Sequence, residues 1–168
     1  NYLAKNKINK DLLNVFNKKI GSDFKLFFYK QGLLKNLKEI VNIKKRHKFD
    51  LLLVYPKIKC STRYIYSKVK KHSLKPQINL RKIINKKSFL NFFLIKSNDL
   101  QSIVEKKYPI IKRLLLQISE EKGCYFSRMS GSGSVCYGIF ESEKTAIEAF
   151  NRMKLRYPNY WLSVTKTI

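Results

Sequence analysis

A run of small residues, Ser130-Gly131-Ser132-Gly133-Ser134, separates two apolar segments in the last third of the chain. Two glycines this close together permit positive φ angles and a close approach of other groups to the backbone. The small side chains also leave backbone N–H groups open to a phosphate or to another loop. The run is not a Walker A loop, because no Gly-Lys-Ser/Thr follows it. The pattern alone leaves two interpretations open, a phosphate-binding loop and an ordinary glycine-rich hairpin turn.

A carboxylate that could act as a base stands near the start of the chain. Asp23 follows Gly21-Ser22 at a predicted helix end and precedes an aromatic run. A carboxylate held against an apolar wall can accept a proton or act as a point charge for a substrate. On spacing alone, a capping aspartate explains the same pattern.

Hydroxyl and aromatic side chains gather just after a predicted strand in the middle of the chain. Ser61 and Thr62 stand at a predicted helix start, where hydroxyls usually serve as caps but can also face an anionic ligand. Tyr64 and Tyr66 follow, and such rings stack on a base or pack in a core.

The elements that position these residues follow from the hydrophobic pattern. We expect strands at 49–56, 124–129, 135–140 and 160–165, and helices at 62–71, 97–107, 109–121 and 143–156. Residues 73–88 show only a weak hydrophobic pattern, and we expect a loop with some helix there. Before residue 49, the pattern predicts a helix over 9–20 with Asn9 as its cap, a strand or buried segment at 24–29, and an extended piece at 33–43.

From residue 49 onward the order is strand, helices, strand, strand, helix, strand, which is the split βαβ or ferredoxin-like pattern. We therefore expect an α+β fold with a four-stranded antiparallel sheet and helices on one face. Residues 49–168 would form this domain, and residues 1–48 would be the C-terminal end of a different, truncated one.

The formal net charge of +25, from 36 Lys+Arg against 11 Asp+Glu, raises the question of a polyanion partner. Lys outnumbers Arg 29 to 7, however, and Asn and Ile are also abundant, so a compositional bias of the genome explains much of the charge. The lysines are dispersed, and no block of five or six like charges marks a nucleic-acid-binding tail. Nucleic acid is therefore not the expected partner.

The cysteines and histidines do not suggest a metal site. Cys60, Cys124 and Cys136 lack paired spacing, so we expect reduced thiols in a cytoplasmic protein. His47 and His72 stand in Lys-rich surroundings and are expected at the surface. No apolar run approaches the length of a membrane-spanning helix, so an integral membrane protein is not expected. A homodimer is compatible with the sequence.

Four motifs taken together resemble the GHMP small-molecule kinases, in order and across almost the whole chain. They are Gly21-Ser22-Asp23 with Phe27-Phe28, Leu53-Val54-Tyr55-Pro56 followed by Ser61-Thr62, Asn98-Asp99-Leu100, and Arg128-Met129-Ser130-Gly131-Ser132-Gly133-Ser134. The resemblance implies that residues 1–48 end a ribosomal S5-like N-terminal domain and that residues 49–168 form the C-terminal domain. It also implies phosphoryl transfer from ATP, with Mg²⁺, to a hydroxyl of a small molecule.

The resemblance further assigns roles to individual residues. Asp23 matches the catalytic aspartate, which accepts or orients the hydroxyl proton. Gly131, Ser132 and Gly133 match the third glycine-rich motif beside the phosphate site. Thr62 and Tyr66 fall where the family contacts substrate, and Tyr66 would stack on a cytosine ring.

Several family features are not found. The glycine-rich ATP loop and the lysine that partners the aspartate would precede Asn1, so we interpret the sequence as cut on its N-terminal side. Lys25 and Leu26 replace the usual Pro-Phe pair, and only Gly32 remains of a glycine-rich turn. Two alternatives stay open: a basic RNA-binding module with a ferredoxin-like sheet, and a non-catalytic relative that keeps the fold.

The isolated 168-residue chain is expected to bind ATP poorly and not to turn over, because the phosphate loop and the lysine are missing from it. A kinase assay on these residues alone checks this. Robust turnover would show that no essential part is missing.

Overall fold

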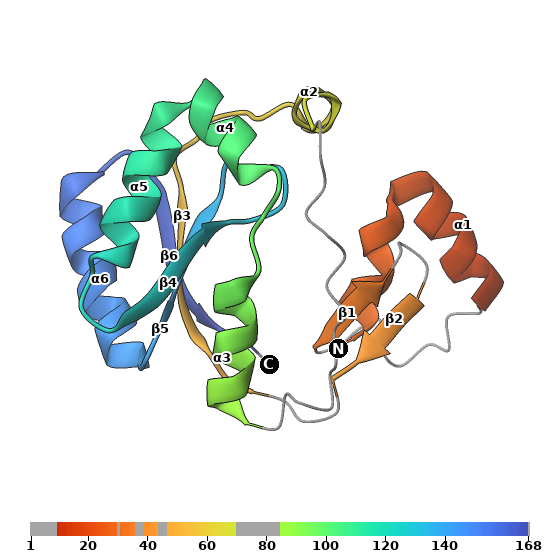
Figure 1. Cartoon of the computed structure of the whole chain (residues 1–168), viewed down its shortest axis with the longest axis horizontal. Coiled ribbons are helices and arrows are strands. Elements are labelled where there is room, and N and C mark those ends of the chain that lie inside the picture. Colours follow the sequence, from red (N-terminus) through yellow and green to blue (C-terminus); the bar gives the residue numbers. More distant parts are fainter. Residues whose placement is uncertain (1–9, 30, 36–38, 44–46, 70–84, 168) are drawn as a thin grey trace. The chain divides into compact units, whose positions relative to one another are not determined.

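The computed structural model describes residues 10–29, 31–35, 39–43, 47–69 and 85–167 (Figure 1). The chain divides into two compact units, one up to Arg46 and one from His47 to Thr167. Each is described here by itself. The assignment of 1–48 and 49–168 to two domains of a kinase stays a prediction.

A four-stranded antiparallel sheet forms the centre of the second unit. Its strands are β3 (Asp50–Tyr55), β4 (Cys124–Met129), β5 (Cys136–Phe140) and β6 (Trp161–Lys166), in the order β4-β5-β3-β6. Numbered from the first strand of the unit, this is 2-3-1-4, the order of a ferredoxin-like sheet. The predicted α+β class and antiparallel sheet are confirmed.

Two long helices, α5 (Pro109–Ser119) and α6 (Glu143–Arg156), pack on one face of this sheet (Figure 1). The packing is tight: a Cβ added at Gly138 of β5 would lie 2.5 Å from Cγ2 of Ile118 on α5. Leu52 and Val54 of β3 point into this core and are fully buried. Burial alternates along β3, as the side chains of a strand point to opposite faces of the sheet, and the strand predicted at 49–56 is confirmed.

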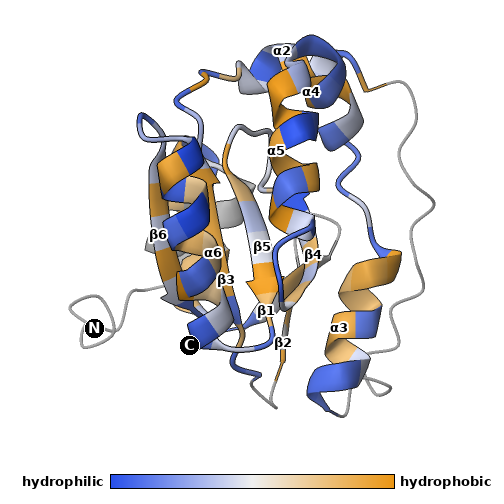
Figure 2. Cartoon of the chain, turned by 90° about the vertical axis from the view of Figure 1, so that its left-hand side faces the viewer, coloured by the Kyte–Doolittle hydropathy of each residue, from blue (hydrophilic) through white to orange (hydrophobic). Residues whose placement is uncertain are grey.

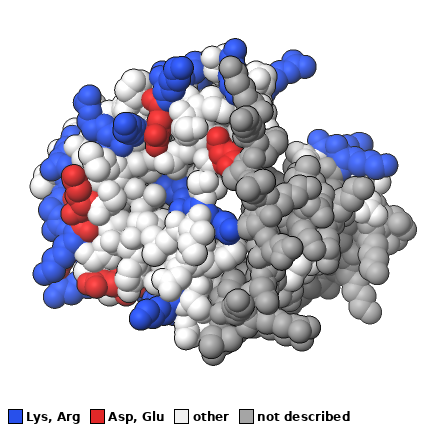
Figure 3. Space-filling view, viewed as in Figure 1, with Lys and Arg blue, Asp and Glu red and all other residues white. Residues whose placement is uncertain are grey.

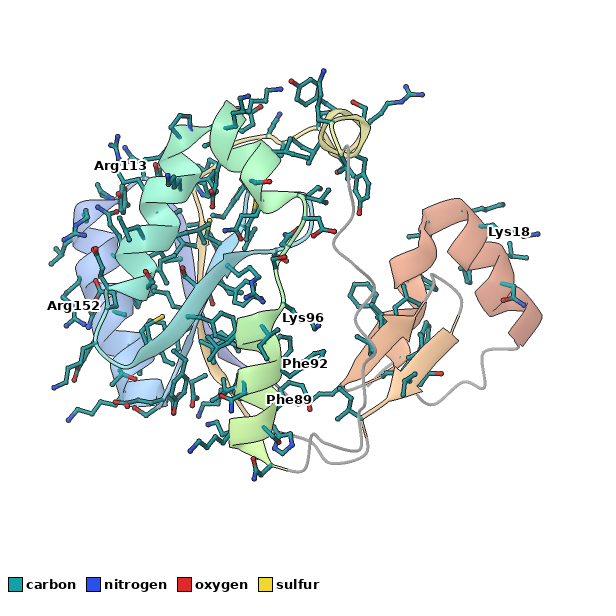
Figure 4. The ribbon with its side chains drawn as sticks, in the orientation of Figure 1. Lys18, Phe89, Phe92, Lys96, Arg113 and Arg152 are labelled. Atoms are coloured by element: carbon teal, nitrogen blue, oxygen red, sulfur yellow. The ribbon has the colours of Figure 1, made fainter. Side chains whose placement is uncertain are left out.

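Helix α3 (Lys86–Ile95), which the sequence did not predict, adds cover to the other face of the sheet. Phe89 and Phe93 of this helix form a ring cluster with Phe49 and Phe126, with centroids 4.8–6.3 Å apart between neighbouring rings. Figure 4 shows Phe89 and Phe92 on this helix, and Figure 2 shows that much of α3 is apolar. Helix α3 therefore covers the part of the second face that holds Phe49 and Phe126.

His47 joins this aromatic cluster, so its predicted surface position is wrong. Its side chain is buried, and its ring centroid lies 5.4 Å from that of Phe89. The backbone carbonyl of His47 accepts a hydrogen bond from the Thr167 hydroxyl at 2.9 Å. Tertiary packing against Phe89 overrides the polar neighbourhood in sequence. His72 lies outside the described residues.

The first unit holds helix α1 (Lys10–Ile20), a 3₁₀ helix η1 (Ser22–Phe28) and an antiparallel pair, β1 (Gly32–Lys35) and β2 (Glu39–Asn42). The strand considered for 24–29 is therefore wrong. The ring of Phe24 packs locally instead: it lies 5.8 Å from that of Phe16 and 5.5 Å from that of Phe28, between centroids, whereas Phe27 is 86% exposed. The proposed cap Asn9 lies outside the described residues.

Helix starts follow the capping signals in the sequence. Ser61 accepts from the Tyr64 N–H and begins α2 (Thr62–Ser67), and Ser142 forms a capping box with Thr145 at the start of α6. α4 (Gln101–Lys107) and α5 are separated by Tyr108, with Pro109 at the first position of α5. Helix α2 ends earlier than predicted, and residues 70–84 lie outside the described part.

Charged side chains are dispersed over the second unit. Figure 3 shows Lys and Arg scattered over its visible face, with Asp and Glu between them. Arg113 and Arg152 extend outward from α5 and α6 in Figure 4, and Arg152 pairs with Glu121 at 2.7 Å. Within the described ranges, no helix is long and apolar enough to span a bilayer.

Replacing Leu52 by Ala should lower the free energy of unfolding by about 2–5 kcal/mol, because the side chain is fully buried at the centre of the sheet. Leu155 on α6 is 85% exposed and provides the matched control. The Leu155→Ala change should stay within about 0.5 kcal/mol. Urea denaturation measures both, and equal effects would contradict this core.

Candidate phosphate-binding loop and its supporting residues

The pairing of β3 with β5 brings two loops together at one end of the sheet. Val54, near the end of β3, pairs with Cys136 at the start of β5. The residues that follow β3 therefore lie beside the glycine-rich loop, residues 130–134. Two hydrogen bonds join them: the Ser134 hydroxyl donates to the Ile58 carbonyl at 2.6 Å, and the hydroxyls of Thr62 and Ser132 lie 2.9 Å apart.

Thr62 and Ser132 were both predicted as site residues, and the structure brings them together. They are 70 positions apart in sequence, and their hydrogen bond is exposed to solvent. Either hydroxyl can donate in this bond. A pair of exposed hydroxyls can turn toward an anion that arrives beside the loop.

The two glycines give the loop its shape. Gly131 has φ +51° and Gly133 has φ +90°, both in the region that favours glycine. A Cβ at Gly133 would lie 2.9 Å from the Met129 sulfur and 3.3 Å from that of Cys60, whereas a Cβ at Gly131 would meet nothing within 4 Å. Gly133 is thus required by close packing, and Gly131 faces open space.

The loop closes on itself as a tight turn between β4 and β5. The Ser130 N–H donates to the Val135 carbonyl at 2.8 Å, and the Gly133 N–H donates to the Ser130 carbonyl at 3.0 Å. These bonds agree with the hairpin interpretation of the sequence pattern. A turn and a ligand loop are compatible, because the turn fixes only part of the backbone.

The start of α4 holds the strand end from the other side. The Asn98 amide donates to the carbonyls of Met129 at 2.9 Å and Gly131 at 2.8 Å. The Gln101 side-chain oxygen accepts from the Met129 N–H at 3.0 Å, and its amide donates to Glu105 at 2.8 Å. The last residue of β4 is therefore bonded by both polar backbone atoms to side chains of one helix start.

Asn98, Gln101 and Ser134 were not predicted as site residues. Asn98 was noted only as part of the Asn98-Asp99-Leu100 motif. The polar residues around Asn98, just before an apolar helix, indicated a helix cap. Nothing in the local sequence indicated that its amide bonds to backbone carbonyls some 30 residues further along the chain. Gln101 and Ser134 gave no separate signal.

Tyr66 lies on α2 and exposes 57% of its surface. It is therefore not a core residue, which was the alternative interpretation of this ring. Tyr64, on the same helix, lies under the Lys107 ammonium at 3.7 Å from the ring centroid. This contact links α2 to the end of α4.

The three thiols of the second unit stay protonated at neutral pH. Burial raises the pKa of Cys60, and the nearby Lys107 opposes that shift. Burial raises the pKa of Cys136 to about 12 and that of Cys124 to about 11. All three cysteines are free, and because burial raises their pKa values none is an activated nucleophile at neutral pH.

A cavity of about 650 Å³ opens next to Asn98. Its lining is polar and of mixed charge, and includes Lys96, Asp99, Glu105 and Arg128. Arg128 donates to the Phe93 carbonyl at 2.9 Å and lies over the Phe126 ring, so its cation is partly engaged.

Asp23 lies in η1 of the first unit, directly after Ser22. Gly21 precedes it with φ +137° and caps the 3₁₀ helix. The role of Asp23 stays a prediction. Across the described ranges, no group of three His, Cys, Asp or Glu side chains is arranged to hold a metal ion.

Comparison with known proteins gives consistent relatives. The chain is 35% identical over 165 residues to a protein of Pelagibacter ubique (strain HTCC1062) named 4-diphosphocytidyl-2-C-methyl-D-erythritol kinase, an alignment that covers 96% of this chain and 57% of the relative. A relative of the same name from a Wolbachia species of Brugia malayi is 35% identical over 114 residues, which is 67% of this chain and 39% of the relative. The chain thus spans about half the length of the curated relatives it matches.

The fold has a solved counterpart. A crystal structure of 4-(cytidine 5'-diphospho)-2C-methyl-D-erythritol kinase matches 90% of this chain and 56% of its own, with a TM-score of 0.68 at 16% identity. Residues 79–159 match the family model described as GHMP kinases C terminal. The chain therefore belongs to the GHMP kinase family, through the C-terminal domain of that family.

Proposed function

We propose that the protein to which this chain belongs is a 4-diphosphocytidyl-2-C-methyl-D-erythritol kinase, which transfers the terminal phosphoryl group of ATP to the 2-hydroxyl of its substrate. This reaction belongs to the non-mevalonate route to isoprenoid precursors. The observation that carries the proposal is the 35% identity to a relative of that name across 96% of this chain.

The glycine-rich loop suits a phosphate site. Phosphoryl transfer needs positioned groups and stabilisation of charge, with little covalent chemistry from the protein. Gly131 borders open space, and the exposed Thr62 and Ser132 hydroxyls stand beside it. In our proposal Gly131, Ser132 and Gly133 border the phosphates, and Thr62 contacts the substrate.

Asp23 is proposed to accept or orient the proton of the substrate hydroxyl. A carboxylate within hydrogen-bond reach of that hydroxyl raises its nucleophilicity in the transition state. Tyr66 is proposed to stack on the cytosine ring, and its exposed ring on α2 supports that role.

ATP and Mg²⁺ complete the proposed site. When bound, Mg²⁺ would supply positive charge that stabilises the phosphates during transfer. We propose that it enters with ATP. The chain's own residues border the phosphates and orient the hydroxyl.

The RNA-binding alternative is not supported. An RNA-binding sheet of this topology would display aromatic side chains on an open face. Here α3 covers part of the face opposite α5 and α6, and Phe126 and Ile139 are buried there. The curated relatives given above are kinases by name.

We further propose a cytoplasmic protein with a small-molecule substrate. The free thiols of Cys60, Cys124 and Cys136 support a reducing compartment. A homodimer is a separate proposal, which the mass of the protein in solution decides.

Replacing Asp23 by Asn in the full protein should lower kcat by about 10²–10⁴-fold, because the amide cannot accept the hydroxyl proton. Coupled-assay kinetics with ATP and the cytidylylated substrate measure this. The exposed Glu120, at the end of α5, gives a control: Glu120→Gln should keep wild-type kcat. An active Asp23→Asn protein would contradict the role of Asp23. An inactive wild-type protein would instead favour the non-catalytic relative.

Gly133→Ala should destabilise the protein more than Gly131→Ala. Both changes place a side chain at positive φ, at a cost of about 1–2 kcal/mol. Gly133→Ala adds contacts at 2.9 Å and 3.3 Å to two sulfur atoms, which should cost about 1 kcal/mol more. Urea denaturation of both variants measures the difference, and equal midpoints would show that the neighbouring side chains move aside.

A further inference from the structure

The side chain of Asn98 makes three hydrogen bonds, and each uses a different part of the amide. Its oxygen accepts from the Leu100 N–H at 3.0 Å, and its nitrogen donates to the carbonyls of Met129 and Gly131. The acceptor toward Leu100 must be the oxygen, since a backbone N–H can only donate. The partners therefore fix which way the amide points.

The bond to Gly131 also fixes the peptide unit that follows. In a trans peptide, the C=O and N–H of one unit point in opposite directions. The carbonyl of Gly131 points at Asn98, so the N–H of Ser132 points away from it. If this peptide rotated, the loop would present a carbonyl oxygen where it now presents a donor.

We propose that Asn98 is a positioning residue that holds the 131–132 peptide so that the Ser132 N–H faces the phosphate side of the glycine-rich loop. The phosphate role rests on the proposed function. The orientation itself does not, because it follows from the hydrogen bonds of Asn98. A carbonyl turned toward a phosphate would repel it, whereas an N–H stabilises its charge.

A purely capping role for Asn98 makes a different prediction. Capping needs only an acceptor for the Leu100 N–H, which Asp or Ser also supplies. Holding two carbonyls needs two donors on one side chain. A carboxylate has none, and a hydroxyl has one. Asn98→Asp thus keeps the cap and removes both donors, whereas Asn98→Ser keeps the cap and can hold only one of the two carbonyls.

Hydrogen–deuterium exchange of the segment 129–135 tests the orientation without any assumption about activity. Its protected amides include Ser130 and Gly133, which donate within the turn. At pH 7 we expect exchange about tenfold faster in Asn98→Asp than in wild type, and a smaller increase in Asn98→Ser, whose hydroxyl can still donate to one carbonyl. Asn151→Asp, an exposed site on α6, adds the same charge and should leave the segment unchanged.

The pH dependence separates the two variants. The carboxyl introduced by Asn98→Asp faces two carbonyls, so its pKa should lie above the usual range for aspartate. Below that pKa it is neutral and donates to one carbonyl, so the excess exchange should shrink toward pH 5. Asn98→Ser should show no such recovery. Lys96, Asp99, Glu105 and Arg128 line the same cavity, and comparison with wild type at each pH cancels their own titration.

Kinetics supply the second readout. In the full protein, Asn98→Asp should lower kcat by about 10²-fold at pH 7, as loss of one oriented donor does, while KM for the alcohol substrate changes less than about threefold.

Unchanged exchange in both variants would overturn the proposal. Faster exchange with unchanged kcat would overturn the phosphate role of the Ser132 N–H. A wild-type protein without kinase activity would refute the proposed function, and the exchange result would still decide the role of Asn98. If Asn98→Asp does not fold, Asn98→Ser carries both measurements.

Discussion

The antiparallel register between β3 and β5 decides where the candidate functional residues meet. Because Val54 pairs with Cys136, the chain leaving β3 and the chain entering β5 lie at the same end of the sheet. Thr62 and Ser132 can bond only because of this pairing. A shift of the register by one residue would turn the alternate side chains of β3 out of the core, so burial of Leu52 and Val54 enforces the alignment. The site thus depends on the same apolar packing that stabilises the fold.

Much of the second unit could be predicted from the sequence, because local signals and tertiary packing agree there. Ser142 caps α6, Pro109 begins α5, and the strand at 124–129 has the predicted bounds. The order of these elements was enough to indicate a ferredoxin-like sheet. Helix α3 was missed because its apolar residues lack a clear one-sided pattern, and its purpose is apparent only once the sheet has a second face to cover.

The candidate site divides in the same way. Thr62, Tyr66 and the glycines could be named only through the order of the motifs, because local chemistry alone was equally compatible with a helix cap, a core ring and a hairpin turn. Asn98 and Gln101 could not be named, because their roles are contacts across about 30 residues with backbone atoms that carry no sequence signature. His47 was misplaced for a related reason: its neighbours in sequence are cationic, but its neighbours in space are phenylalanine rings.

The hydrogen bond between Thr62 and Ser132 has a consequence for the cost of binding. In this bond one hydroxyl donates its hydrogen to the oxygen of the other, and the O–H of the second hydroxyl is not used in the bond. That second hydroxyl can donate a hydrogen bond to an incoming oxygen atom while the bond between the two side chains stays intact. The two rotamers are then already restrained before the ligand arrives, so less side-chain entropy is lost on association. Two residues on separate segments thereby act as a preorganised unit.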